Sequence, residues 1–197
     1  NPTESHINSI VVPHAGFQYS GLCAMSAYHL SYSKKYKRIL VLATDHQSLT
    51  GLHYIKSHIQ LGNYFINVET SSKLLSLFKS KGVKMVNANN TLVHSEHGLL
   101  NHVPLIHYFY RGNIPVVPFI VGKLNPREIE TYGKLLATLA DDTTLVICST
   151  DLNHINGTFS HKVEGPNTSD KIRKADSEIL RLLTNEKITN GNFVETI

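Results

Sequence analysis

Imidazole and polar side chains follow three apolar segments of the sequence, each with the length and composition of a buried strand. His14 comes directly after the first segment, His46 lies three residues after the second, and Asp151, Asn153 and His154 lie in the loop after the third. The three segments are residues 10–13, 39–43 and 144–148. Side chains beyond the carboxyl ends of parallel strands line the ligand crevice of a doubly wound α/β domain. We therefore expect one fold to bring these residues to the same edge of a sheet.

Their chemistry is that of a divalent metal site. Two neutral imidazoles with one carboxylate or amide oxygen suit iron, zinc or copper and leave coordination positions open for reaction. Beside this set, His97 is the candidate general base, and Asp45 or Glu96 is a candidate to fix the imidazole tautomers by hydrogen bonding. Asp151 and His154 are alternative ligands. For each histidine taken singly, a helix cap or a hydrogen-bonded strand end remains the commoner use.

Composition excludes several classes of protein. With 197 residues and 41% hydrophobic side chains, the chain has the size of one domain with a sizeable core. Its net charge of +4 comes from scattered lysines without a dense basic stripe, so we expect no nucleic-acid partner. No apolar segment approaches the roughly twenty residues that a membrane span needs. Cys23 and Cys148 lie in expected regular elements, which indicates no disulfide framework and a reducing, cytoplasmic location.

The order of strands and helices predicts the fold class. Apolar strand segments alternate with amphipathic helices, which is typical of a three-layer α/β/α sandwich with a mainly parallel central sheet. Pro126 and the capping residue Asn125 begin one clean helix, and Pro118 inside an apolar strand indicates an edge or a bulge. The other expected helices cover residues 21–30, 71–80 and 170–183, with minor strands between residues 54 and 68 and at residues 84–86.

Two helical segments carry more specific predictions. In the segment 21–30, Leu22 and Leu30 belong to the stripe expected to pack against the sheet, and Cys23 is expected in or beside the core. In the segment 91–110, Ser95 is the expected cap of a helix whose first turn holds Glu96 and His97. Pro104 predicts a bend or a restart of that helix.

Five motifs resemble, in order, those of the Memo-like family, also called AmmeMemoRadiSam system protein B. The resemblance runs from about Ile10 to the end of the chain, and it implies a fold similar to that of class III, LigB-type, extradiol dioxygenases. The motifs are residues 12–21 (VPHAGFQYSG), 44–46 (TDH), 96–97 (EH) with 102–104 (HVP), 114–122 (IPVVPFIVG) and 149–154 (STDLNH).

The resemblance also implies roles for individual residues. His14 and His46 match the two metal-binding histidines, and His97 matches the histidine that acts as acid and base in the dioxygenases. Asn153 falls at the position of the third ligand, where animal Memo proteins have a cysteine, and its neutral amide oxygen is a weaker ligand than a thiolate or carboxylate. Because members of the family begin further upstream and continue further downstream, we expect residues 1–197 to form one Memo-like domain without those terminal elements.

Three functions remain open at this point. The first is a metal-dependent oxidoreductase with a non-haem-iron type of site, in which iron is favoured over zinc or copper. The second is a binding or adaptor protein that keeps the fold and the crevice without turnover and without metal. The third is a metal-dependent hydrolase, for which Glu96 is the candidate carboxylate base. The expected partner is an unidentified small molecule or protein, and the family name implies a functional link to a radical-SAM protein.

Overall fold

The structure, a computed structural model, describes residues 7–153 and 166–184. The chain divides into two compact units, Asn1–Thr150 and Asp151–Ile197, and each is described by itself. The first unit is a sheet with helices on both faces, and the second contains helix α7 (Thr168–Thr184). None of the helices within the described ranges has the length and hydrophobicity needed to cross a membrane. The single domain expected for residues 1–197 stays a prediction.

The sheet of the first unit has a central set of parallel strands. Its order is β1-β8-β2-β7-β3-β6, in which β1, β8, β2 and β7 run parallel while β3 runs antiparallel to β7. β5 pairs with the beginning of β7, and β4 pairs with β5. The bounds are β1 Ser9–Val12, β2 Arg38–Thr44, β3 Leu52–Tyr54, β4 Ile59–Leu61, β5 Tyr64–Val68, β6 Met85–Asn87, β7 Pro115–Val121 and β8 Thr144–Ser149.

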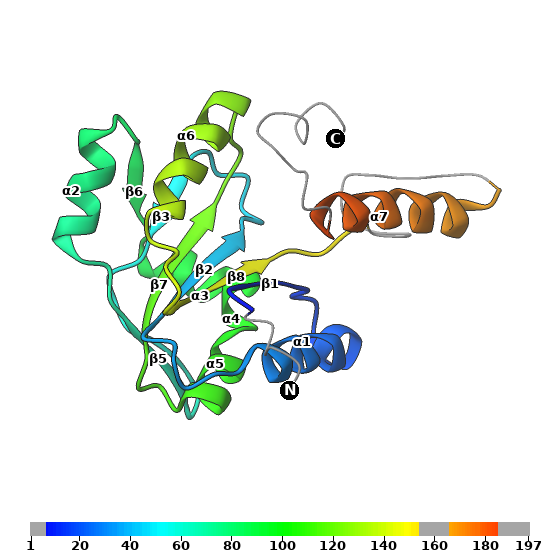
Figure 1. The fold of residues 1–197 in the computed structure, drawn as a ribbon, viewed down its shortest axis with the longest axis horizontal. Helices are drawn as coiled ribbons and strands as arrows, with labels where there is room; N and C mark the ends of the chain where they lie inside the picture. Colours follow the sequence, from blue (N-terminus) through cyan, green and yellow to red (C-terminus); the bar gives the residue numbers. More distant parts are fainter. Residues whose placement is uncertain (1–6, 154–165, 185–197) are drawn as a thin grey trace. The chain divides into compact units, whose positions relative to one another are not determined.

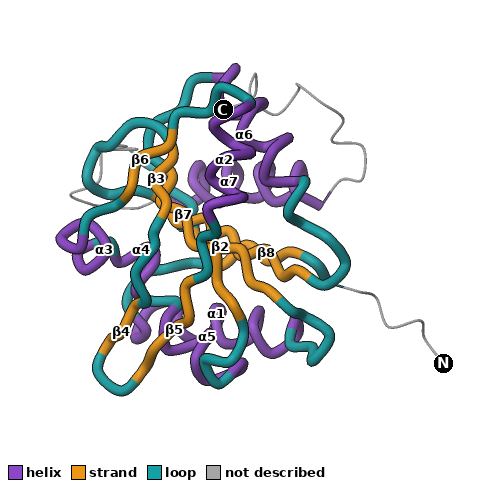
Figure 2. Tube along the Cα trace, turned by 90° about the vertical axis from the view of Figure 1, so that its left-hand side faces the viewer, coloured by secondary structure: helices purple, strands orange, loops and turns teal. Residues whose placement is uncertain are grey.

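Helices cover both faces of this sheet, as Figures 1 and 2 show. Successive side chains of a strand point to opposite faces, and β2 accordingly feeds two cores: Ile39, Val41 and Ala43 join one cluster, whereas Leu40 joins the other. This arrangement confirms the predicted three-layer fold with a mainly parallel sheet. The first cluster packs against α1 (Phe17–Ser31), α3 (Asn90–Ser95), α4 (His97–Leu100) and α5 (Val103–Tyr110), and the second against α2 (Ser72–Ser80) and α6 (Pro126–Ala137).

The start of α6 confirms a prediction made from local sequence. Asn125 accepts a hydrogen bond from the backbone N–H of Glu128, and the Glu128 carboxylate accepts one from the backbone N–H of Asn125, at 3.0 and 2.9 Å. Pro126 occupies the first turn, where its missing N–H leaves no acceptor unsatisfied. This capping box needs only residues that are neighbours in sequence.

The buried face predicted for α1 was wrong. Leu22 and Leu30 are 83% and 73% exposed, Cys23 is exposed, and the inward residues include Ala24 and Tyr28. Apolar residues lie all round this helix, so its periodicity does not single out one face. Tertiary contacts choose the face.

The position predicted for the strand that contains Pro118 was also wrong. β7 lies inside the sheet, with β2 on one side and β3 on the other. On the latter side, β5 pairs with Pro115 and Val116, and β3 pairs with residues 119–121. Pro118 lies between these two pairings, where the missing N–H interrupts no ladder.

Segment 91–110 forms three short helices. Ser95, expected to cap a helix, is instead the last residue of α3. The cap of α4 is Glu96, whose carboxylate accepts a hydrogen bond from the backbone N–H of Gly98. The restart expected near Pro104 is confirmed, because α5 begins at Val103 with the proline in its first turn.

Candidate metal centre

Three imidazole rings meet at the carboxyl-end edge of the parallel strands. His14 lies two residues after β1, His46 lies two residues after β2, and His97 is the first residue of α4, which packs against β2. One ring nitrogen from each residue can be chosen so that all three lie within 4.8 Å of one another. The ring centroids are 5.0 Å apart for His14 and His46, 5.5 Å for His14 and His97, and 3.9 Å for His46 and His97. The structure thus brings together the two histidines that the sequence assigned to metal binding and the one that it assigned to acid–base chemistry.

The orientation of His14 is set by Ser149, the last residue of β8. The His14 Nδ1 lies 2.8 Å from the Ser149 Oγ, and the Ser149 hydroxyl also contacts the carbonyl oxygen of Gly98. A carbonyl oxygen can only accept, so the single hydroxyl proton is donated to Gly98 and Ser149 must accept from His14. His14 is therefore protonated at Nδ1, and in the neutral ring Nε2 carries the lone pair that a metal needs.

His46 is oriented in the same sense by Glu96. The Glu96 Oε1 lies 2.6 Å from the His46 Nδ1, and the Oε2 accepts from the His46 backbone N–H at 2.8 Å. Because an ionised carboxylate only accepts, His46 donates from Nδ1 and presents the lone pair at Nε2. A carboxylate hydrogen-bonded to the ring nitrogen that does not bind the metal is a common support for histidine ligands, since it fixes the tautomer and raises the basicity of the ring.

Glu96 is the electrostatic support of the cluster. Its side chain has no exposed surface, and it accepts three N–H donors: the ring and the backbone of His46, and the backbone of Gly98 at 2.9 Å. These hydrogen bonds compensate for the burial of a charge that would otherwise be costly. A Cβ on Gly98 would lie 2.8 Å from the backbone oxygen of Thr44, so the close approach of α4 to β2 requires glycine here.

His97 differs from the other two histidines. Its side chain is 46% exposed, and its Nδ1 lies 3.9 Å from the Glu96 Oε1, beyond hydrogen-bond distance. The carboxylate thus acts on His97 through its charge, whereas it holds His46 by a direct bond. The ring nearest to solvent in the cluster is thus less constrained by Glu96 than the His46 ring is.

Asp45 lies beside His46 in sequence and is engaged with the loop that follows β2. Its two carboxylate oxygens accept hydrogen bonds from the backbone N–H groups of Gln47 and Leu49, at 2.9 and 2.6 Å. These bonds organise a turn in which Ser48 has a φ of 58°. Of the two carboxylates that the sequence offered as partners of an imidazole, Glu96 is the one hydrogen-bonded to His46.

The residues expected from the loop after β8 belong to the second unit, and one of them lies outside the described residues. Asn153 donates hydrogen bonds from its backbone and from its side-chain amide to Asp176 on α7, at 3.3 and 2.6 Å. Asp151 is half-buried and also belongs to the second unit. His154 lies outside the described residues. Metal ligation by Asn153, and by the alternatives Asp151 and His154, stays a prediction.

The sequence did not single out three residues that hold the cluster together. Ser149 orients His14, the Asn101 side chain donates to the His14 backbone oxygen at 2.7 Å, and the Thr44 hydroxyl donates to the Ser149 backbone oxygen at 2.9 Å. The position of Ser149 at the end of an apolar strand was the available signal. Its partner became identifiable only with the β1–β8 register, which places Val12 opposite Ser149.

The donor set fits a divalent transition metal. Two imidazoles with fixed Nε2 lone pairs and a third imidazole close by match the nitrogen ligands that zinc, iron and copper accept. A hydrogen-bonded carboxylate and a hydroxyl behind the rings supply the outer support that such ligands need. The three histidines are thus positioned so that they can hold a metal ion.

Comparison with known proteins decides the family. A family model described as "Memo-like protein" matches residues 1–196. The chain belongs to the Memo-like family. This chain is 28% identical over 196 residues to a MEMO1 family protein of Sulfolobus acidocaldarius, covering 94% of this chain and 66% of that one.

Other relatives come from archaea and vertebrates. A MEMO1 family protein of Methanothermobacter thermautotrophicus is 30% identical over 155 residues, covering 75% of this chain and 54% of the relative. Protein MEMO1 of Xenopus tropicalis is 26% identical over 164 residues, covering 78% and 52%. The chain therefore spans between about half and two thirds of the length of these Memo-like relatives, 52% to 66%.

Proposed function

We propose that this Memo-like protein binds a divalent metal ion at His14 and His46, with His97 beside the ion as the proton-transfer residue, and acts as a metal-dependent oxidoreductase. The observation that carries the proposal is the fixed presentation of the Nε2 atoms of His14 and His46 by Ser149 and Glu96. Histidines that merely cap strands need no such matched orientation of their second nitrogen. Iron is the favoured ion, with zinc and copper as the alternatives that the same donors accept.

A bound ion would supply Lewis acidity and, in the case of iron or copper, a redox centre. The protein fixes the two inner ligands, His14 and His46, by holding a proton on the Nδ1 of each ring. His97 stands at the solvent side of the cluster with its Nδ1 facing the Glu96 carboxylate at 3.9 Å. Its exposed position suits it to exchange a proton with a bound molecule.

A hydrolase is less well supported by the geometry. A metal hydrolase would use a carboxylate base beside the attacking water, and Glu96 is the carboxylate at this cluster. Its Oε1 already accepts two N–H donors and its Oε2 accepts one, and it has no exposed surface. Glu96 thus serves as support for His46, with no accessible oxygen for water activation.

Metal binding is tested by loading the protein with ferrous iron, zinc or copper and measuring bound metal by elemental analysis. We expect one ion per chain in the wild type and none in the double variant His14→Ala/His46→Ala. The matched control is His29→Ala/His94→Ala, which removes two exposed imidazoles and should bind as the wild type does. Near-zero occupancy in all three proteins, with intact folding, would contradict the proposal and favour the binding or adaptor function.

The redox part is tested separately, under anaerobic loading with ferrous iron. We expect the loaded wild type to consume oxygen faster than the double variant His14→Ala/His46→Ala at the same iron concentration. Tight zinc binding with no iron-dependent oxygen consumption would refute the oxidoreductase while leaving the metal site. The link to a radical-SAM protein and the cytoplasmic location stay predictions.

A further inference from the structure

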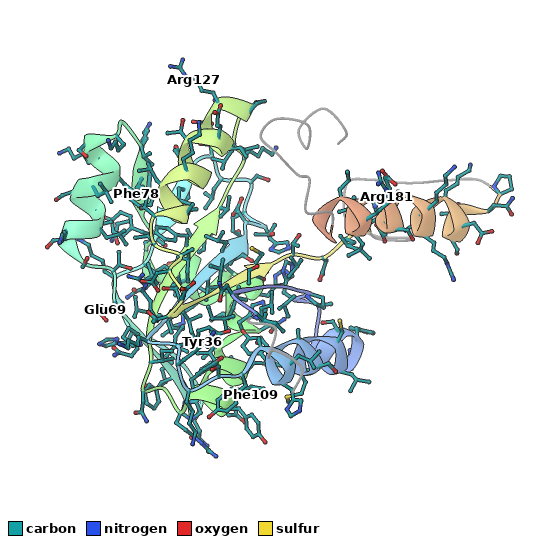
Figure 3. The ribbon with its side chains drawn as sticks, viewed as in Figure 1. Tyr36, Glu69, Phe78, Phe109, Arg127 and Arg181 are labelled. Carbon is teal, nitrogen blue, oxygen red and sulfur yellow. The ribbon has the colours of Figure 1, made fainter. Side chains whose placement is uncertain are left out.

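A cavity of the first unit lies at the opposite edge of the sheet from the histidines. It has a volume of about 300 Å³ and is bordered by the residues that precede β2 and β7. Each of these strands has seven residues, so at about 3.3 Å per residue the cavity lies roughly 20 Å from the strand ends that carry the histidines. It is therefore a separate site. Figure 3 labels Tyr36 and Phe109 on the side of the sheet that α1 and α5 cover.

Aromatic rings form one wall of this cavity. The ring centroid of Tyr32 lies 6.0 Å from that of Phe109 and 5.5 Å from that of Tyr110, with interplanar angles of 43° and 48°. Tyr32 is 44% exposed, so its ring is accessible from solvent. Tilted rings at these distances offer faces and edges against which a further aromatic ring can pack.

The charged side chains at the cavity are all cations. Lys34, Lys37 and Arg111 line it, and no carboxylate does so within the described residues. None of the three forms an ion pair with another described residue, although Arg111 lies over the ring of Tyr108 at 6.0 Å. Cationic side chains grouped around a cavity attract anions, and their N–H groups form strong hydrogen bonds with phosphate or carboxylate oxygens.

The Tyr110 hydroxyl is a donor in the wall for which the described residues offer no acceptor. It is buried and makes no hydrogen bond of ordinary geometry to the described residues, although it lies towards the Ser33 backbone N–H. Burial first, and then the nearby Tyr36 and Tyr32, raise the pKa of Tyr110, so the hydroxyl remains a donor. Buried polar groups are normally hydrogen-bonded, and a ligand with an acceptor oxygen at this cavity would satisfy the hydroxyl.

A larger cavity nearby, of about 560 Å³, does not carry the same inference. It shares Lys37 but is also lined by Glu69 and Asp141. Mixed charges do not select the sign of a ligand. The smaller cavity combines one sign of charge, aromatic walls and an unpaired donor.

We propose that this cavity binds a small aromatic anion, a ring that carries one phosphate, sulfate or carboxylate group. The ring packs against Tyr32 and Phe109, while the anionic group accepts from Lys34, Arg111 and the Tyr110 hydroxyl. The volume fits a single ring with one such group, at the lower end of the range for ligand pockets.

The test is to titrate the protein with phenyl phosphate at low salt and to measure binding by calorimetry. Inorganic phosphate and phenol, which are the two halves of this probe, are titrated separately for comparison. We expect phenyl phosphate to bind about tenfold more tightly than either half, because ring and anion are held together. Phenyl sulfate and benzoate, titrated in the same way, identify which anionic group the site prefers. Equal affinity for inorganic phosphate and phenyl phosphate would overturn the proposal, and so would the absence of binding of all three aromatic anions at roughly 1 mM.

Variants separate the cavity from general charge attraction. Tyr110→Phe removes only the unpaired hydroxyl and should weaken binding about fivefold or more, and Lys34→Gln should weaken it by a similar factor. The matched controls are Tyr19→Phe and Lys79→Gln, which make the same changes at exposed positions on other helices and should leave binding unchanged. Equal affinity in Tyr110→Phe and the wild type, with an unchanged circular dichroism spectrum, would refute the role of the hydroxyl. Equal losses in Lys34→Gln and Lys79→Gln would refute the cavity.

Discussion

Replacement of Glu96 by glutamine tests the support of the candidate metal centre most directly. The substitution keeps the size of a side chain that has no exposed surface and changes only its charge and one acceptor atom. The amide oxygen can retain the bonds from the His46 ring and the Gly98 backbone. The amide nitrogen then faces the His46 backbone N–H, where two donors meet in place of the 2.8 Å hydrogen bond.

The size of the effect follows from these contacts. Loss of one hydrogen bond to a charged group costs about 1.5–3 kcal/mol, and relief of a buried charge offsets part of this, so we expect the free energy of unfolding of the metal-free protein to fall by about 2 kcal/mol. Metal affinity should fall more clearly. The neutral amide no longer raises the basicity of the His46 ring, and loss of such a partner typically reduces metal affinity about 10- to 100-fold.

Two measurements separate these effects. Urea denaturation in the presence of a chelator gives the stability of the metal-free protein, and competition with a chromogenic chelator gives the affinity for zinc or ferrous iron. Glu69→Gln makes the same chemical change at an exposed carboxylate of the first unit and should alter neither quantity. If Glu96→Gln bound metal as tightly as the wild type while remaining folded, the assignment of Glu96 as the support of His46 would be refuted.

Three further substitutions, and one control at Gly133, have outcomes that follow from the surroundings of a single residue. Ser149→Ala removes the acceptor of the His14 ring, and we expect a loss of about 1–3 kcal/mol in the free energy of unfolding together with weaker metal binding, measured by denaturation and competition as above. Gly98→Ala forces a Cβ to within 2.8 Å of a backbone oxygen and should lower the midpoint of unfolding in urea. Gly133→Ala, at a position in α6 with open space around it, should instead raise the free energy of unfolding by about 0.5–1 kcal/mol. Equal shifts in urea denaturation for the two variants would contradict the packing at Gly98. Asn125→Ala removes one half of the capping box and should cost about 1 kcal/mol in thermal or urea unfolding, with no change in metal affinity.

Local sequence was sufficient for the elements whose causes are local. The apolar segments of β2 and β8 and the capped start of α6 were predictable because a strand run or a capping box involves residues close together in the chain. The same holds for the start of a new helix at α5, because Pro104 fits only in the first turn of a helix. The edge at which the histidines gather was predictable too, because the carboxyl ends of parallel strands share one side of a sheet.

Contacts between distant residues decided the rest. The bond that orients His14 joins residues 135 positions apart, and the bond that orients His46 spans 50 positions. Neither partner could be read from its neighbours, since Ser149 and Glu96 acquire these roles only through the register of β8 against β1 and the close approach of α4 to β2. The buried face of α1 was undetermined for the same reason, because a helix that is apolar all round takes its inner face from what it packs against. Sequence alone identified the histidines and the edge at which they meet, whereas the tertiary structure determined which nitrogen each inner histidine offers to a metal.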